Sequence, residues 1–154
     1  GLGDDIFVFT SVSNGTDTVF DMNFGGVQGS VDRIDISALG LVFSGGFDLV
    51  SQDADAFVTD EDILVVSGQS FENIGQLDSY YEHRFSDASG TGSNVLVLWF
   101  DNLAVAHLSV GVGATGEMAT VDGDDEFTFY DLAVLAGVAQ NNLVSAVGTG
   151  DFIV

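Results

Sequence analysis

The opening segment Gly1–Phe9 has the residue types and the spacing of a calcium-binding turn. Residues 1–8 match all but the first residue of the nonapeptide G-G-x-G-x-D-x-U-x. The glycines permit backbone angles that turn carbonyl oxygens toward an ion, and Asp5 adds a carboxylate. The alignment predicts Gly1, Gly3 and Asp5 as calcium ligands and Phe7 as a core residue. One turn is only part of a site, because Ca²⁺ takes about six to eight oxygen ligands.

A second acidic segment echoes the first one. Residues 3–9 and 123–129 both read G-D-D-x-F-x-F. Two interpretations stay open, namely a recurrent acidic turn that leads into a strand with alternating aromatic residues, or a shared calcium-binding role. In the second interpretation Asp122, Asp124 and Asp125 are further calcium ligands. A weaker candidate loop holds Asp53, Asp55, Asp60, Glu61 and Asp62.

Other chemistries find little support in the residues. The absence of Cys excludes disulfides and thiolate metal sites. No EF-hand loop and no G-x-S-x-G motif is present. His83 and His107 are the only histidines, and they lie far apart without an H-E-x-x-H motif, so we interpret them as two unrelated surface or strand residues. Trp99 lies in an apolar run and is expected in the core.

The charge balance narrows the class of protein. There are 24 acidic residues, mostly Asp, against two basic ones, Arg33 and Arg84. Such a chain lacks the basic footprint for nucleic acid or anionic membranes, and it has no apolar run of about 18 residues for membrane insertion. Self-repulsion opposes its compact state until cations neutralise it. An Asp-rich, Lys-free and Cys-free chain indicates a secreted calcium-binding β protein, whereas a halophilic cytosolic protein would usually be rich in Glu as well.

The elements that must position these residues are mostly short strands between Gly, Asn and Asp turns. The sequence predicts a mainly β single domain of β-roll or β-sandwich type, stabilised by calcium, with one or two short helices. The predicted helices cover residues 70–81 and 131–139, and a helical turn is expected at 37–40. The run Val95–Phe100 indicates a strand buried on both faces. The predicted strands cover residues 6–9, 18–20, 33–36, 47–50, 63–66, 95–100, 103–110 and 127–129.

A family resemblance follows from these motifs. The opening segment, then Asp17–Asp21 (D-T-V-F-D), then Val31–Leu39 (V-D-R-I-D-I-S-A-L), resemble the end of an RTX calcium-binding β-roll. More closely, they are similar to the C-terminal domain of serralysin-type proteases and related type I secreted proteins. The ending Asp151-Phe152-Ile153-Val154 resembles the acidic residue and apolar tail that close such proteins. The resemblance is good over residues 1–40, weaker at 95–110 and 137–154, and absent from about 45 to 92.

The resemblance implies a non-catalytic module that binds calcium and folds outside the cell. It divides the chain into the end of a β-roll (1–40), a β-rich body (41–150) and a secretion-signal-like tail (151–154). The tail, Asp151, Phe152, Ile153 and Val154, would serve the type I secretion machinery as an uncleaved export signal. A chain end is exposed and mobile by default, so we expect truncation of this tail to affect export more than stability. The implied location is extracellular or at the cell surface.

Two other functions stay open at this point. The chain could be a structural subunit of a calcium-linked extracellular filament or surface layer, in which the edge at Gly1 meets a segment near Gly123–Phe129 at the opposite end of a second copy. It could also be a glycosidase or lyase that uses paired Asp residues, although nothing in the sequence selects a pair. The chain does not begin with Met and has no Sec-type signal, which suggests a fragment or a processed product.

Overall fold

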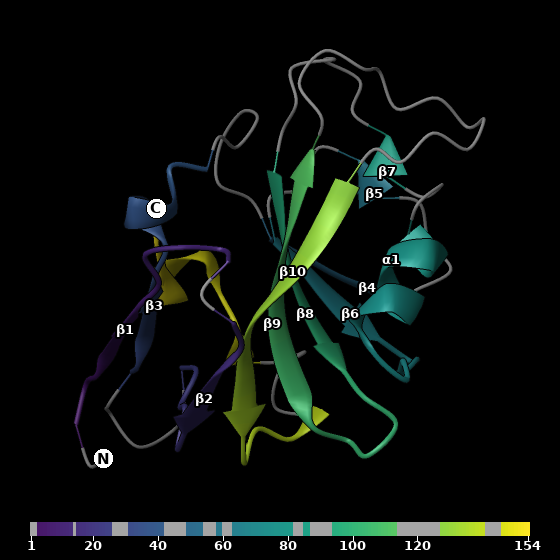
Figure 1. Cartoon of the computed structure of the whole chain (residues 1–154). Helices are drawn as coiled ribbons and strands as arrows, with labels where there is room; N and C mark the ends of the chain where they lie inside the picture. Colours follow the sequence, from purple (N-terminus) through teal and green to yellow (C-terminus); the bar gives the residue numbers. More distant parts are fainter. Residues whose placement is uncertain are drawn as a thin grey trace.

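The described part of the protein is mainly β, with two principal sheets and the helix α1 (Figure 1). The computed structural model describes residues 3–13, 15–25, 31–41, 49–53, 58–59, 63–81, 85–86, 94–113, 127–140 and 146–154. The first sheet has three parallel strands in the order β1-β3-β11, formed by Ile6–Val8, Arg33–Asp35 and Phe152–Ile153. The second sheet has six strands in the order β2-β10-β9-β8-β6-β4. They are Asp17–Phe20, Phe127–Ala136, Ala106–Gly113, Asn94–Phe100, Ile63–Ser67 and Leu49–Asp53.

Smaller elements complete the described part of the chain. The helix α1 is Ile74–Tyr81, and a two-stranded sheet pairs β5 (Val58–Thr59) with β7 (Phe85–Ser86). Two 3₁₀ turns, η1 (Ser37–Leu39) and η2 (Thr149–Asp151), lie next to strands of the three-stranded sheet. The predicted helical turn at 37–40 is therefore confirmed, and Gly40 ends it at φ +65, which a residue with a Cβ rarely adopts.

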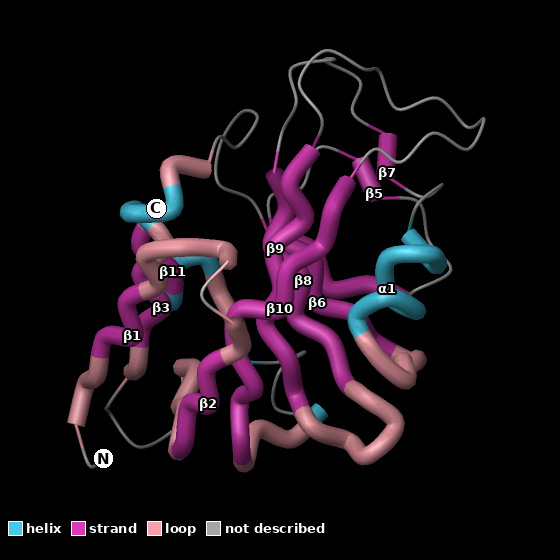
Figure 2. The backbone as a smooth tube through the Cα atoms, viewed as in Figure 1, coloured by secondary structure: helices cyan, strands magenta, loops and turns pink. Residues whose placement is uncertain are grey.

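The three-stranded sheet, the six-stranded sheet and α1 form successive layers, with the large sheet in the middle (Figure 2). One core lies between the two sheets and includes Ile34, Leu98, Leu108 and Phe152. A second core lies on the other face of the large sheet, where Trp99 and Phe129 pack with residues of the α1 segment such as Leu77. Apolar side chains on both faces make the large sheet the interior layer of the molecule.

Strand β8 is buried along its whole length, as the sequence predicts. Leu96, Leu98 and Phe100 belong to the core between the sheets, whereas Val95, Val97 and Trp99 belong to the core under α1. Successive side chains of a strand point to opposite faces, so a strand covered on both sides needs apolar residues throughout. The unbroken run therefore follows from the central position of β8, and Trp99 is confirmed as a core residue at 1% exposure.

The predicted helix over 131–139 is wrong. Strand β10 continues to Ala136, pairing with β9 and, from Ala133 onward, in parallel with β2. A β-bulge interrupts the pairing between Asp131 and Ala133. The carboxylate of Asp131 accepts hydrogen bonds from β9 instead of capping a helix. Pairing on both edges thus outweighs the local helical preference of Leu132–Ala139.

The predicted helix over 70–81 is confirmed in type but begins later. Phe71 forms an isolated parallel bridge with Asp101, and its N–H donates to the carbonyl of Phe100. Asn73 then starts the helix, because its side-chain oxygen accepts the N–H of Gln76. The first residues of the predicted helix thus anchor α1 to the end of β8.

Candidate functional site

The first candidate site lies where residues 3–5 meet residues 31–33. Strands β1 and β3 pair in parallel with Ile6 opposite Arg33, which places Asp5 beside Asp32. Oδ1 of Asp32 accepts the N–H of Asp5 at 2.9 Å, and Oδ2 accepts the N–H of Asn23 at 2.9 Å. The Arg33 N–H in turn donates to the Asp5 carbonyl at 2.8 Å. The Asp32 side chain, in a residue only 4% exposed, therefore connects three segments of the chain.

Asp32 was not among the predicted ligands, although the segment Val31–Leu39 that carries the resemblance contains it. Its role depends on the parallel pairing of β1 with β3, which brings Asp5, 27 residues away in the sequence, next to Asp32. No local pattern indicates that both carboxylate oxygens accept backbone N–H groups. Such bonds satisfy a buried carboxylate without any cationic side chain.

The described residues supply only part of a calcium shell. Gly3 and the exposed Asp5 are described, and Oδ1 of the neighbouring Asp4 accepts the N–H of Val31 at 3.2 Å. The other predicted ligands, Gly1, Asp122, Asp124 and Asp125, lie outside the described residues. Within the described ranges, no group of three or more His, Cys, Asp or Glu residues is placed to hold a metal ion. Of the weaker loop, Asp53 ends β4, and its other acids lie outside the described residues.

The two copies of the G-D-D-x-F-x-F motif lead into different environments. Residues 6–8 form β1, which pairs in parallel in the small sheet, whereas residues 127–129 begin β10, which is antiparallel to β9 in the large sheet. Strand β10 pairs with β2 only through Ala133–Ala136, whereas residues 127–129 pair with Gly111–Gly113 of β9. The expectation that the segment 123–129 lies at the opposite end of the molecule from the opening segment stays a prediction, because residues 123–126 lie outside the described residues.

The tail 151–154 is built into the small sheet. Phe152 lies opposite Ile34 in β3 and is 7% exposed, and the Ile153 carbonyl accepts the N–H of Ile36 at 2.9 Å. Asp151 is 5% exposed, and its Oδ2 accepts the Gly148 N–H at 2.8 Å. Burial raises the pKa of Asp151, against the smaller opposing effect of that hydrogen bond. The expectation of an exposed tail is therefore wrong for these two residues, whereas Val154 is 56% exposed.

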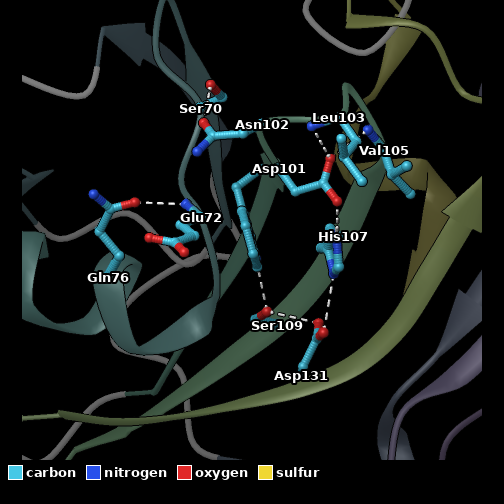
Figure 3. Close-up of polar contacts among 11 residues, drawn as sticks. Ser70, Glu72, Gln76, Asp101, Asn102, Leu103, Val105, His107, Ser109 and Asp131 are labelled. Carbon is cyan, nitrogen blue, oxygen red and sulfur yellow. Dashed lines mark hydrogen bonds and ion pairs between the residues drawn. The ribbon is translucent and has the colours of Figure 1, made fainter.

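A second polar site, which the sequence did not predict, surrounds His107 on β9 (Figure 3). Its Nδ1 is hydrogen-bonded to Oδ2 of Asp131 at 2.9 Å, and its Nε2 lies 3.6 Å from Oδ2 of Asp101. The imidazole also stacks on the Trp99 indole, with ring centroids 4.3 Å apart and planes 17° from parallel. The three partners come from the end of β8, the turn after it and the bulge of β10.

Ser109, a buried residue of β9, is the fourth partner in this cluster. The Trp99 indole N–H donates to the Ser109 hydroxyl at 2.8 Å, and that hydroxyl donates to Oδ1 of Asp131 at 3.1 Å. Ser109 is fully buried. Both oxygens of Asp131 are therefore occupied, one by the hydroxyl and one by the imidazole. A chain of bonds runs from the core under α1 to the surface of β10.

The carboxylates control the charge of the imidazole. Burial alone would lower the pKa of His107, but the hydrogen bond and charge of Asp131, followed by the nearby carboxylate of Asp101, outweigh it and raise this pKa. Burial would raise the pKa of Asp101, but hydrogen bonds from the Val105 and Leu103 amides and the nearby His107 ring outweigh it and lower this pKa. The geometry thus favours an imidazolium between two carboxylates.

This arrangement does not resemble a hydrolytic or metal centre. The two ring nitrogens of His107 face carboxylates on opposite sides, so Asp101 and Asp131 cannot converge with the ring on one ion. Ser109 is buried and donates its proton to Asp131 rather than to the imidazole. Nucleophilic catalysis needs an accessible hydroxyl bonded to its base. The cluster is built to connect strands.

Comparison with known proteins adds no family assignment. No family model, no curated protein and no solved structure matches this chain. None of the helices in the described residues has the length and apolarity to span a membrane.

Proposed function

We propose that this chain is a non-catalytic, calcium-binding module of a type I secreted extracellular protein, and that it folds on calcium outside the cell. The observation that carries the proposal is the path of residues 6–35. The chain passes from β1 in the small sheet to β2 in the large sheet and back to β3, which stacks in parallel on β1. The acidic turns that precede β1 and β3 are joined through Asp5 and Asp32. This path agrees with the β-roll end that the motifs resemble.

The charge of the chain supports the same function. With a formal net charge of −22, the compact state has strong self-repulsion, and only two basic side chains can offset it. Asp32 has only backbone N–H donors for its two hydrogen bonds, and Asp4 and Asp5 lie in the same turn region. Cations that bind the folded chain stabilise it by mass action, so external calcium would favour folding and low cytosolic calcium would not.

Circular dichroism and thermal melts in millimolar Ca²⁺, in Mg²⁺ at equal ionic strength and in chelator test the proposal. A calcium site gives a larger rise in melting temperature in Ca²⁺ than in Mg²⁺, because Mg²⁺ requires a smaller octahedral shell. Asp5→Ala should reduce that difference. Asp17→Ala, which removes the same charge from an exposed position on β2, should not. Equal melts in Ca²⁺ and chelator would contradict calcium binding, and equal effects of the two ions would indicate charge screening alone.

A structural role in a filament or surface layer is the second candidate, and one observation favours it. Among the described strands, β1 and β2 each pair on one side only, so consecutive strands form an edge of both sheets. Ile6 and Val8 on β1 and Phe20 on β2 are large exposed apolar residues there. Unpaired strand edges are templates for another chain. Size-exclusion chromatography and negative-stain microscopy with and without Ca²⁺ distinguish the two candidates, since a calcium-loaded monomer at high protein concentration would exclude self-assembly.

A further inference from the structure

We propose that His107 is a proton-operated latch that joins the turn between β8 and β9 to the bulge of β10. The ring lies between the carboxylates of Asp131 and Asp101, which belong to those two elements (Figure 3). An imidazolium carries N–H groups at both nitrogens and attracts both carboxylates. Neutral imidazole has one N–H and one lone pair, so it can donate to only one of them.

The distances indicate which connection the neutral ring releases. Nδ1 is 2.9 Å from Asp131, within hydrogen-bonding distance, whereas Nε2 is 3.6 Å from Asp101 and has no hydrogen-bond partner. The contact with Asp101 therefore rests mainly on charge. When the proton leaves, the short bond keeps the N–H at Nδ1, and the lone pair of Nε2 then faces a carboxylate. The turn is the element that the deprotonated ring no longer holds.

The turn between β8 and β9 is strained and exposed, so it is the element expected to loosen when His107 loses its proton. Ala104 adopts φ +61, a left-handed conformation that is strained for a residue with a Cβ. Oδ1 of Asp101 accepts the N–H groups of Leu103 and Val105, each at 2.8 Å. Leu103 at the tip is 84% exposed. Asp101 thus maintains a strained, exposed turn, and His107 holds Asp101.

The charged groups in contact with the ring, and those on the described elements packed beside it, are all acidic. Besides Asp101 and Asp131, the described elements that pack against β10 contribute Asp17 on β2 and Asp78 on α1. Trp99 and Ser109, the remaining partners of the cluster, do not titrate in the neutral range. No described basic side chain opposes protonation of His107 there. Asp131 and Asp101, the two carboxylates against the ring, thus favour its charged form.

The sign of the pH dependence follows from the directions of the two pKa shifts. The folded pKa of His107 is raised above its ordinary value of 6.5, so the latch is complete below pH 6.5 and is lost as pH rises through the raised folded pKa. The folded pKa of Asp101 is lowered from 3.8, so its contribution is present above pH 3.8 and is lost as pH falls through the lowered folded pKa. The latch is therefore closed in mildly acidic solution and opens on the alkaline side.

Trp99 gives a direct readout, because it is the only tryptophan and stacks on His107. An imidazolium accepts an electron from an excited indole better than neutral imidazole does, so Trp99 fluorescence should rise as the proton leaves. We expect a fluorescence titration in the wild-type protein with a midpoint above 6.5. The titration should disappear in His107→Gln and persist in His83→Gln, which alters the other histidine of the chain.

Amide hydrogen exchange, corrected for the intrinsic effect of pH, tests whether the turn loosens when the ring loses its proton. The protection of the Leu103 and Val105 amides should fall across the same midpoint, while protection in the centre of β8 does not. The His107 ring protons followed by NMR in the wild-type protein give the pKa even if His107→Gln does not fold. A His107 midpoint at or below 6.5 would overturn the proposal, as would turn protection that is independent of the ring titration. Such independence would assign the cluster a purely structural role.

Discussion

The buried carboxylate of Asp32 and the half-buried carboxylate of Asp131 show two ways in which an acidic side chain connects β segments. Asp32 in the small sheet receives its hydrogen bonds from the backbone N–H groups of Asp5 and Asn23. Asp131 in the large sheet receives them from the side chains of Ser109 and His107. Backbone amides keep their protons at all ordinary pH values, whereas an imidazole loses one near neutrality. We call these connections the Asp32 junction and the Asp131 junction. The donors of the Asp32 junction do not titrate near neutrality, whereas one donor of the Asp131 junction, His107, does.

The largest expected loss of stability comes from removing the Asp32 carboxylate, which breaks the Asp32 junction. Asp32→Ala removes the shared acceptor of the Asp5 and Asn23 amides, and the loss of these two part-buried hydrogen bonds to a charged group should cost about 3 kcal/mol of unfolding free energy in total. Urea denaturation at pH 7 measures the loss. Asp17→Ala removes the same charge at an exposed site and should change stability by less than about 0.5 kcal/mol. Equal losses in both variants would mean that net charge, not the hydrogen bonds, decides.

Removing the buried Ser109 hydroxyl from the Asp131 junction should cause a smaller loss of stability. Ser109→Ala removes the acceptor of the Trp99 indole N–H and one donor to Asp131, with an expected loss of about 2 kcal/mol. In a Trp99→Phe background that indole donor is absent, so the additional loss from Ser109→Ala should be about half as large. Strict additivity of the two substitutions in denaturation experiments would show that the bond between them contributes nothing.

A third carboxylate, Asp151, sharpens the comparison with the smallest effect on stability. It has one backbone donor, and burial raises its pKa, so its ionised form is disfavoured in the folded state. This penalty is present at neutral pH and disappears as pH falls through the raised folded pKa toward 3.8. Asp151→Asn keeps an acceptor for Gly148 and should leave the melting temperature at pH 7 unchanged or slightly raised.

The same variant separates export from folding. If the acidic charge before the apolar tail forms part of the proposed export signal, Asp151→Asn should reduce secretion by a matching type I exporter although the protein remains stable. Truncation of residues 152–154 is less informative, because Phe152 is a core residue and its removal alone should cost about 3 kcal/mol. If the Asp151→Asn variant is secreted as well as the wild-type protein, the charge of Asp151 is not part of an export signal.

Much of the fold could be predicted from local patterns. The run Val95–Phe100 has no polar residue, which correctly predicts that strand β8 is buried on both faces. The strands at 6–8 and 33–35 agree with the alternation of their residues. Of the candidate site, the position of Asp5 directly before a strand is confirmed. Asp32, although present in the aligned motif, could not be predicted as the buried acceptor, because its partners depend on how β1 stacks on β3.

What the sequence alone determined is therefore the β-rich class, the central strand and the strong negative charge, because these depend on composition and on short-range periodicity. Only the tertiary structure decided that residues 131–136 form a strand, that His107 lies between two carboxylates and that Phe152 fills a core. The physical reason is the same in all three cases. Each depends on a partner at least six and up to about 120 residues away, and the energy of pairing and burial there exceeds the weak preferences of the local segment.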